Sequence, residues 1–404
     1  MSTIGLDGVL SWAQAHHVAA TCSGALPSVK ARLDEAAGGI LSRALATLAD
    51  DPAHDAAAFH GYAVCGEGPW SLVLDTTVGP GEAVSVRAGD AIPHHTDAVL
   101  ALSDSVSETS SSGSVHVFAC DPLSGVPDER ARPDFGTGII RQGDLGPAGR
   151  ELVAAGSIVT PGVLALAAAT GHDTIDIVKP PTVGLIVLGR SLLSHGMPRE
   201  GRVRDALGMT IPSFISANGG IGNPAKRAPD TAELLLTEID DANVDVIITT
   251  GSTEPAPGNH VRQVIGDLNA RWLIDGVSVT PGAQMLMARL PDGRILVGLP
   301  GNPAAALAGL VTLVGPLLRS MSGRTNVIDH PTGVLLDDAP PADYADDTRL
   351  APVRRELRDG ATLLRPIPED GPAGLVGWAR ADAVAICPPG AGYRGDVLHY
   401  IPLS

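Results

Sequence analysis

GLPGNPAAALAGLVTLVGPLLRSMSG, residues 298–323, begins with a corner rich in glycine and proline and continues as an apolar helix. Asn302 suits the N-cap of that helix and Pro303 its first turn, where no amide hydrogen bond is lost. Glycine lets the backbone approach a ligand, and free amides at a helix start favour an anion. The stretch therefore predicts a tight strand-to-helix corner, which either faces a phosphate or only packs the helix on its sheet.

The sequence before this corner alternates apolar strands with helices. The pattern predicts strands at 182–189, 244–251 and 294–301, and helices at 209–220, 231–242 and 303–322. Continuous Val, Ile and Leu runs between helices are typical of a parallel sheet that is covered on both faces. In such sheets the ligand crevice lies past the carboxyl ends of the strands. A second glycine-rich segment, TTGSTEPAPG (249–258), falls at such an end.

The rest of the chain predicts a multidomain α/β protein with an insertion. Residues 7–50 carry two apolar-periodic runs that predict helices, whereas short strand-like runs separated by Gly, Pro and Ser follow up to about residue 120 and return after residue 326. We therefore predict an N-terminal helical and linker subdomain (1–45 and 145–178), an inserted β-rich module (46–144), an α/β domain (179–326) and a C-terminal β domain (327–404).

Composition limits the classes of partner. The net charge of −17 disfavours nucleic acids and anionic membranes, because both carry negative charge. The longest apolar stretch, near 303–318, is shorter than the roughly 18–20 residues that span a bilayer. No basic segment followed by an apolar run marks a signal peptide, and four scattered cysteines are typical of free thiols in a reducing compartment. We expect a cytoplasmic protein without direct membrane insertion.

Several motifs carry a resemblance to a known family. They are FHGYAV (59–64), GEAVSVRAGDAIPHHTDAVL (81–100), RDALGMTIPSFISANGG (204–220), VDVIITTGSTEPAPGNHVRQVI (244–265), the GLPGNP helix and ARADAVAICPPGAGYRGDVLHYIPL (379–403). In this order they resemble the MoeA/gephyrin E-domain family, the molybdopterin molybdenumtransferases, over essentially the whole chain. The resemblance implies an elongated homodimer of four subdomains per chain, with an α/β subdomain that resembles a molybdopterin-binding fold.

The resemblance also implies a chemistry and its residues. The family hydrolyses adenylylated molybdopterin and inserts molybdenum from molybdate into the dithiolene with Mg²⁺, between the α/β subdomain of one chain and the inserted module of the other. Asp205 would be a catalytic residue and metal ligand, or would cap the helix that follows it; Asp144 would be a second metal ligand, or a solvated loop residue. The residues expected to line the crevice are Thr249, Thr250, Gly251, Ser252, Gly298, Pro300, Gly301 and Asn302.

The sequence departs from the family where chemistry is expected. An acidic residue is replaced by His60, a hydroxyl residue by Ala88, and a glutamate is absent from the Gly189-Arg190-Ser191 segment. Two lysines are replaced at Thr280 and Ala283. Further changes lie at Gly208, Met209, Asn259, His260 and in Asp370-Gly371-Pro372. Each lost charge-assisted bond removes roughly 1.5–3 kcal/mol, so these changes predict weaker binding of a phosphorylated pterin unless other groups compensate.

Two functions stay open at this point. The first is a divergent molybdopterin molybdenumtransferase, an enzyme that works with altered ligands. The second is a catalytically depleted dimeric scaffold, which holds partner peptides such as cytoskeletal or membrane-receptor tails in a groove between the α/β and C-terminal domains, as gephyrin does. A replacement metal cluster of His60, His94, His95 and His260 is a further hypothesis, which requires that the dimer brings these residues together.

Overall fold

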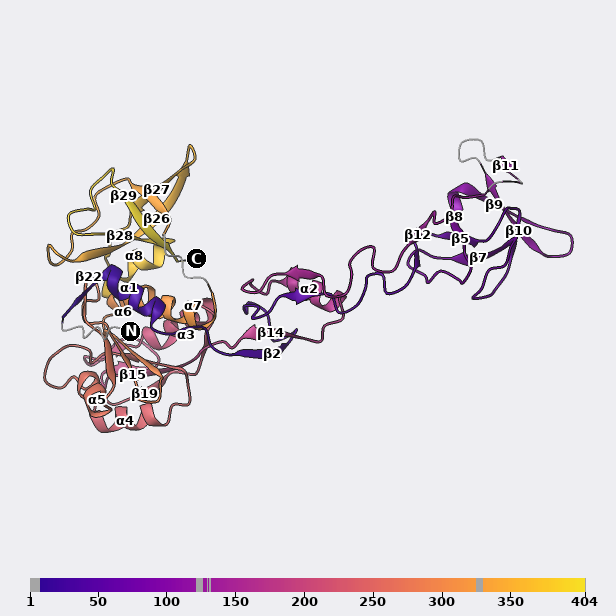
Figure 1. The fold of residues 1–404 in the computed structure, drawn as a ribbon. Helices are drawn as coiled ribbons and strands as arrows, with labels where there is room; N and C mark the ends of the chain where they lie inside the picture. Colours follow the sequence, from indigo (N-terminus) through magenta and orange to yellow (C-terminus); the bar gives the residue numbers. More distant parts are fainter. Residues whose placement is uncertain (1–7, 121–125, 129, 131, 325–329, 404) are drawn as a thin grey trace. The chain divides into compact units, whose positions relative to one another are not determined.

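The computed structural model describes residues 8–120, 126–128, 130, 132–324 and 330–403. The predicted boundary between residues 326 and 327 lies outside these residues. The chain divides into two compact units (Figure 1). The first comprises residues 1–42, 158–160 and 176–404, and the second comprises residues 43–157 and 161–175.

A largely parallel sheet forms the centre of the first unit. Its parallel strands β15 (Thr182–Leu188), β20 (Val246–Thr250) and β24 (Ile295–Leu299) are neighbours, which confirms the three predicted strands. Val187 pairs with Thr250 and Thr249 with Gly298, so the carboxyl ends of these strands lie side by side. The sheet is completed by β18 (Ile221–Gly222) and β19 (Lys226–Ala228), both parallel to β15, and by antiparallel β23 (Leu286–Arg289) and β21 (Arg271–Asp275).

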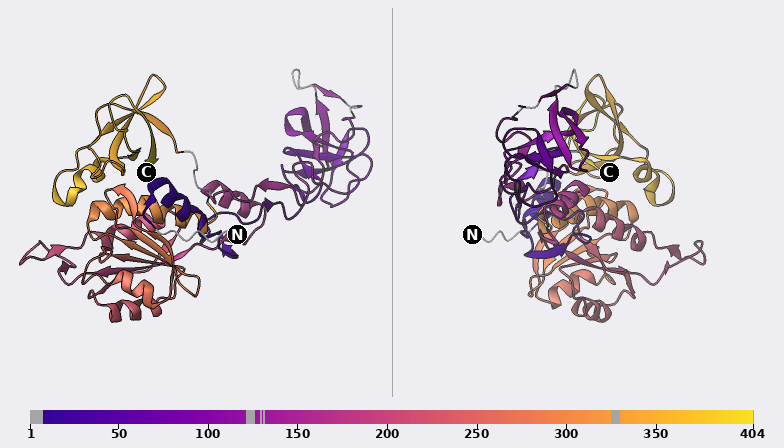
Figure 2. Two further views of the ribbon diagram at one scale, coloured as in Figure 1. Left: turned by 60° about the vertical axis from the view of Figure 1, so that its left-hand side comes forward. Right: turned by 90° about the vertical axis from the view of Figure 1, so that its right-hand side faces the viewer.

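Helices cover both faces of this sheet (Figures 1 and 2). α4 (Ala232–Asp240) and α5 (Val261–Asp267) pack on one face with Ile186 and Leu188. The other face carries α1 (Trp12–Thr21), α3 (Leu207–Ala217) and the helical run that follows β24, and receives Val183, Leu185 and Val187. Successive side chains of a strand point to opposite faces, so β15 must be apolar almost throughout to serve both layers.

The helical run after β24 confirms the helix predicted at 303–322 and ends at Met321. It consists of α6 (Pro303–Gly309), the π-helical turn η2 (Leu310–Val314) and α7 (Gly315–Met321). The run covers 19 residues and passes a length and composition test for a membrane span, so the apolar stretch near 303–318 understated its length. However, 83% of its apolar window is buried inside the protein, as expected for a core helix.

The C-terminal strands form a closed ring, which leaves no free edges within it. The predicted C-terminal β domain is thus observed, with ring order β26–β27–β25–β29–β28 and back to β26. The strands are β25 (Thr332–Leu335), β26 (Thr348–Arg358), β27 (Ala361–Pro366), β28 (Ala383–Cys387) and β29 (Val397–Pro402). β22 (Val277–Thr280) and β1 (Leu10–Ser11) extend the sheet from β26 towards the α/β domain.

The second unit contains the predicted short strands around a small core with the fully buried Trp70. Its main sheet is built from β5 (Gly61–Val64), β6 (Trp70–Leu72), β7 (Glu82–Val86), β8 (Ala98–Ala101), β9 (Ser105–Thr109), β10 (Val115–Cys120) and β11 (Pro127–Asp128). Its helix α2 spans Pro161–Ala169.

The second N-terminal helix that the sequence predicts does not form. Residues 29–48 instead contain most of strand β2 (Ser28–Arg32), turns, and strand β3 (Leu45–Ala46). Gly38, with φ +74°, interrupts the apolar periodicity. β3 pairs with β13 (Glu151–Val153), a segment about a hundred residues away, which a local pattern cannot reveal.

Candidate functional site

The GLPGNP corner follows β24 and has the predicted local structure. Asn302 is the N-cap of α6, and its side-chain oxygen accepts a hydrogen bond from the Ala305 amide at 3.2 Å. Gly298 lies within β24, where a Cβ atom would come within 2.7 Å of Leu286. Gly298 is therefore required for packing between strands, whereas Pro300 and Gly301 form the corner itself.

The corner after β20 lies beside it. Gly251 donates its amide to the Leu299 carbonyl at 2.8 Å, and a Cβ atom on Gly301 would meet the Gly251 Cα atom at 3.4 Å. Gly251 also contacts the end of β15, because its own Cβ atom would lie 3.4 Å from the Leu188 carbonyl. Three strand ends thus converge with little side-chain bulk between them. We call the region around Gly189, Gly251 and Gly301 the strand-end crevice, because parallel α/β sheets bind their ligands past such strand ends.

The polar side chains of this corner have different surroundings. Thr249 and Thr250 are buried at the end of β20, and alternation along the strand sends their side chains to opposite faces of the sheet. Thr250 therefore lies on the face that carries α3. Ser252, at φ +59°, accepts the His260 amide at 2.6 Å and so closes the loop.

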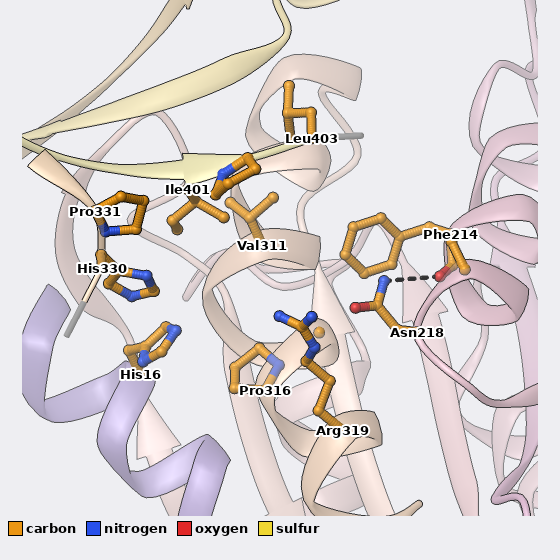
Figure 3. A pocket seen from close by; sticks show the side chains of 13 residues that line it. His16, Phe214, Asn218, Val311, Pro316, Arg319, His330, Pro331, Ile401 and Leu403 are labelled. Carbon is orange, nitrogen blue, oxygen red and sulfur yellow. Dashed lines mark hydrogen bonds between the residues drawn. The ribbon is translucent and has the colours of Figure 1, made fainter. Parts of the chain in front are cut away.

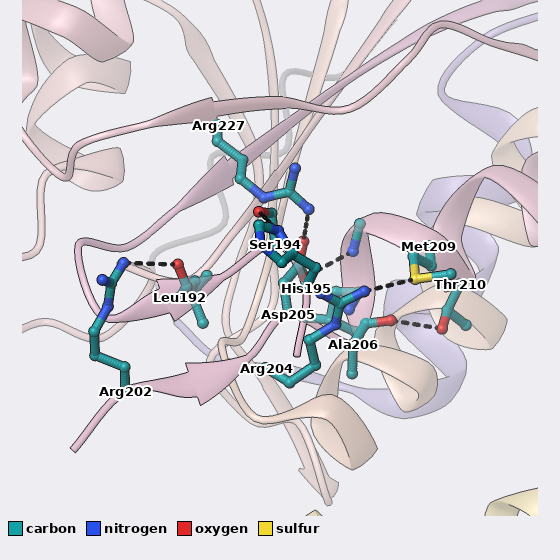
Figure 4. Close-up of polar contacts among 12 residues, drawn as sticks. Leu192, Ser194, His195, Arg202, Arg204, Asp205, Ala206, Met209, Thr210 and Arg227 are labelled. Atoms are coloured by element: carbon teal, nitrogen blue, oxygen red, sulfur yellow. Dashed lines mark hydrogen bonds and ion pairs between the residues drawn. The ribbon is translucent and has the colours of Figure 1, made fainter. Parts of the chain in front are cut away.

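Asp205 lies at the start of α3, on the sheet face that carries this helix (Figure 4). It is only 3% exposed, and its Oδ1 atom accepts the Leu207 and Gly208 amides at 3.0 and 2.9 Å. Its Oδ2 atom lies 2.5 Å from Nη2 of Arg227 on β19. Both carboxylate oxygens are thus occupied within the chain. Asp205 precedes the N-cap residue Ala206 and caps the first two amides of α3, which was the alternative to metal binding.

The other expected ligands do not assemble a metal site within the described residues. No group of three or more His, Cys, Asp or Glu side chains that could hold a metal ion occurs there. Asp144 belongs to the second unit, is exposed, and accepts the Arg141 amide at 2.9 Å in a local turn. His60 likewise accepts the Ala88 amide at 3.3 Å. The histidine cluster that depends on a dimer stays a prediction.

The sequence reasoning missed a group of arginines next to the crevice. The segment after β15 forms β16 (Leu192–Leu193) and β17 (Val203–Arg204), which pair in parallel before α3 begins. It carries Arg190, Arg199, Arg202 and Arg204. Counting charges along the sequence would have revealed them, since few other segments of this acidic chain are basic.

A second feature of the first unit is a cavity of about 490 Å³ between the α/β domain and the C-terminal strands (Figure 3). Its lining includes His16 on α1, Phe214 and Asn218 near the end of α3, Arg319 on α7, His330, and Ile401 on β29. No local motif could have shown this cavity, because its residues come from five distant segments.

The two histidines of the cavity are paired. The His16 ring lies 5.1 Å from that of His330 and 5.0 Å from that of Trp12, between ring centroids. Burial lowers the pKa of His16, and His330 and His17 add to this effect, so that the pKa lies at about 4. Burial also lowers the pKa of His330, with His399 and Arg319 adding to the effect. Both imidazoles are therefore held in the neutral form near neutral pH.

Comparison with known protein families covers both units. Residues 10–171 match the family model of the MoeA N-terminal region (domain I and II), and residues 184–320 match that of the probable molybdopterin binding domain. The chain belongs to the MoeA family.

Individual relatives of this MoeA-family chain span nearly its full length. The molybdopterin molybdenumtransferase of Staphylococcus aureus (strain Mu50) is 24% identical over 409 residues, which cover 92% of this chain and 91% of the relative. That of Bacillus subtilis (strain 168) is 27% identical over 327 residues, 80% of this chain and 73% of the relative. A structure of a molybdopterin biosynthesis MoeA protein from Pyrococcus horikoshii has a TM-score of 0.75 at 21% identity and covers 98% and 100% of the two chains. This likeness confirms the predicted α/β multidomain fold.

Proposed function

We propose that this chain is a molybdopterin molybdenumtransferase of molybdenum cofactor biosynthesis. In this reaction the adenylate of adenylylated molybdopterin is hydrolysed and molybdenum from molybdate enters the dithiolene. The observation that carries the proposal is the strand-end crevice, where the half-buried Gly251 and the exposed Gly301 bring the ends of neighbouring strands together without a side chain. Relatives with this named activity align along almost the whole chain, which supports the same assignment.

The residues of the crevice would bind and orient the substrate. Glycine at positions 251 and 301 removes side-chain bulk, so the flat pterin or its phosphates could come close to the main chain. Ser252 is held by the His260 amide, and Asn302 is held as a helix cap, so neither has to reorganise when a ligand arrives. Such preorganised polar groups lower the cost of binding.

Mg²⁺ dependence is implied for this chain only by its resemblance to the family. Asp205, the expected ligand, is already neutralised by Arg227 and by two backbone amides, and the described residues offer no group of three ligands. The residues present in one chain do not fit the ion, and we derive no step through it. Asp205 instead serves to fix the start of α3 beside the crevice.

A homodimer is also part of the proposal. In the family arrangement the inserted module of a second chain completes the site. Residues 46–144 of one chain would therefore act at the strand-end crevice of the other chain. Sedimentation equilibrium should give a mass near twice the 41.2 kDa of the chain. A monomer at the concentration used for an activity assay would overturn this part.

The experiment is an insertion assay with adenylylated molybdopterin and molybdate, read out by AMP release and by activation of a molybdenum-free enzyme. A Gly301→Leu variant fills the crevice at a position where a Cβ atom makes only an ordinary 3.4 Å contact. It should lose activity while its melting temperature is kept. Gly266→Leu is the matched control, because that glycine is exposed on α5 with nothing within 4 Å. The absence of turnover by the folded wild-type protein would refute the proposal.

The second candidate, a scaffold that binds partner peptides, is favoured by the cavity of about 490 Å³. It is lined by apolar side chains and by Arg319, whose Nε atom is buried without a hydrogen-bond partner among the described residues. A Leu403→Arg variant would block capture of a peptide partner, while Gly301→Leu would not. Leu357→Arg, at an 80% exposed position on β26, is the control. Capture that is insensitive to Leu403 would exclude this cavity as the scaffold's groove.

A further inference from the structure

The segment that follows β15 is strongly basic within an acidic protein. Residues 190–227 contain six of the 28 Lys and Arg residues and only two acidic ones, Glu200 and Asp205, while the whole chain has a net charge of −17. Asp205 forms an ion pair with Arg227, and Lys226 forms one with Glu238 of α4. Among the described residues, no ion pair engages Arg190, Arg199, Arg202 or Arg204. We call these four residues the arginine surface (Figure 4 shows Arg202 and Arg204).

The backbone places two of these arginines directly opposite each other. Arg199 and Arg202 exchange amide-to-carbonyl hydrogen bonds of 3.1 and 2.8 Å across a tight turn. Glu200 and Gly201 have φ values of +53° and +71°, as a hairpin turn of the primed type requires. Directly opposed residues of an antiparallel pair point to the same side, and like charges there repel. No ion pair joins an acidic side chain to Arg199 or Arg202 in the part of the chain that the structure describes.

Arg204 continues the same surface. It lies two residues beyond Arg202 in an extended segment, so the two side chains leave the chain on the same side. Arg202 Nη2 lies 3.5 Å from the Leu192 carbonyl, and Arg204 Nη2 lies 3.5 Å from Met209 Sδ, a weak acceptor. Nη1 of Arg204 is buried and has no hydrogen-bond partner among the described residues. A guanidinium has five donors, and most of those in Arg204 are unused.

The arginine surface begins where β15 ends at the strand-end crevice. Arg190 follows Gly189 directly, and the Val203 and Asp205 amides bond to the Ser191 and Leu193 carbonyls, which tie the segment back beside that strand end. We propose that the arginine surface binds a tetrahedral oxyanion of the substrates, and thereby supplies positive charge to a chain that has no lysine at Thr280 and Ala283. This inference rests on the proposed function for the identity of the ligand, which is either a phosphate group of the adenylylated pterin or molybdate.

The chemistry favours arginine for this role. The guanidinium is planar, always charged, and donates in pairs to phosphate-like oxygens. A protein with an overall negative charge repels a polyanionic substrate, so a local basic surface is needed to hold it. The exposed Arg190, Arg199 and Arg202 leave room for such a ligand.

The test compares the wild type with a double variant, Arg202→Gln and Arg204→Gln. The control is Arg354→Gln with Arg358→Gln, which removes two exposed charges from β26. Calorimetric titrations use AMP, molybdate and adenylylated molybdopterin as separate probes. Loss of two charge-assisted contacts should weaken binding of at least one probe about a hundredfold, and the control should change it less than about threefold. A second variant, Arg202→Lys with Arg204→Lys, should retain part of the affinity because it keeps the charge.

The outcomes separate the source of the oxyanion from the proposed function. Weakened AMP binding assigns the surface to phosphate, and weakened molybdate binding assigns it to molybdate. Equal binding of all probes by the wild type and the Gln variant overturns the inference, even if turnover stands. Arginine-dependent binding of AMP or molybdate by a wild type that fails to bind adenylylated molybdopterin supports the surface and refutes the proposed function.

Discussion

Asp205 and Arg227 form an ion pair of 2.5 Å between the start of α3 and the strand β19. Val187 of β15 pairs with Arg227, so the pair fixes α3 to the end of the first parallel strand. A Cβ atom at position 208 would lie 2.4 Å from Asp205 Oδ2, so a side chain at Gly208 would disturb this ion pair. Each carboxylate oxygen of Asp205 thus has a hydrogen-bond or ion-pair partner within the chain.

We predict that Asp205 acts as a helix cap. Asp205→Ala removes the acceptor of two amides and should lower the free energy of unfolding by about 1–3 kcal/mol. Asp205→Asn keeps a side-chain oxygen for these amides and should cost clearly less. Urea denaturation of both variants provides the comparison. If Asp205 held Mg²⁺ instead, EDTA would lower the melting temperature of the wild type and leave that of Asp205→Asn unchanged.

Gly298 should be essential for packing within the sheet. Gly298→Ala places a methyl group 2.7 Å from Leu286 Cδ1 and 3.1 Å from Thr253 Cγ2, so overpacking should destabilise the fold by about 1–3 kcal/mol. Gly266→Ala in α5 is the control, and it should be neutral or stabilise by up to about 1 kcal/mol. Thermal unfolding of the two variants checks the difference. Equal melting temperatures would show that Gly298 is not tightly packed.

The stability of the protein should depend on pH through His16. The pKa of this imidazole is about 4 in the folded protein, compared with 6.5 for an unperturbed histidine. Because the unfolded chain gains a proton first, stability should fall as the pH decreases from about 6.5 to about 4, by a contribution of about 3 kcal/mol, and should level off below. His16→Gln should flatten this part of the profile, whereas His54→Gln at an exposed site should not. Parallel profiles for the wild type and His16→Gln would contradict this prediction.

Thr280 and Ala283, the two positions where the resemblance implies a lysine, should differ in their tolerance of a substitution to lysine. Thr280 is buried and bonded through Oγ1 to Asp347 at 3.1 Å, so Thr280→Lys should destabilise the fold, since it removes this bond and buries a charge. Ala283 is partly exposed, and Ala283→Lys should be tolerated. The latter should bind AMP about tenfold more tightly, if the family's lysine contact can be rebuilt there. Titration of the two variants with AMP, together with their melting temperatures, separates these effects.

The sequence predicted the α/β domain well for a physical reason. A strand buried on both faces, such as β15 or β20, must be apolar throughout, and this pattern is visible without any partner. Residues 29–48 were mispredicted because β3 depends on a distant partner, β13. Local periodicity reports burial, but it does not report which segment supplies the next strand.

The sequence predicted the backbone corners of the candidate site but not the contacts of its side chains. The glycine corners at Gly251 and Gly301 follow from strand ends and turn chemistry, and the structure brings them together. The partner of Asp205 could not be foreseen, because Arg227 lies on strand β19, 22 positions further along the chain. The arginine surface had a signal in the charge pattern, whereas the pairing of Arg199 with Arg202 depends on the turn between them.

The most direct test of the proposed function is a calorimetric titration of the folded, full-length wild-type protein with adenylylated molybdopterin, with and without molybdate. We predict micromolar or tighter binding that is lost in Gly301→Leu and kept in Gly266→Leu. No detectable binding to a protein that is shown to be folded would contradict the assignment as a molybdenumtransferase and would direct attention to the cavity lined by His16, Arg319 and His330.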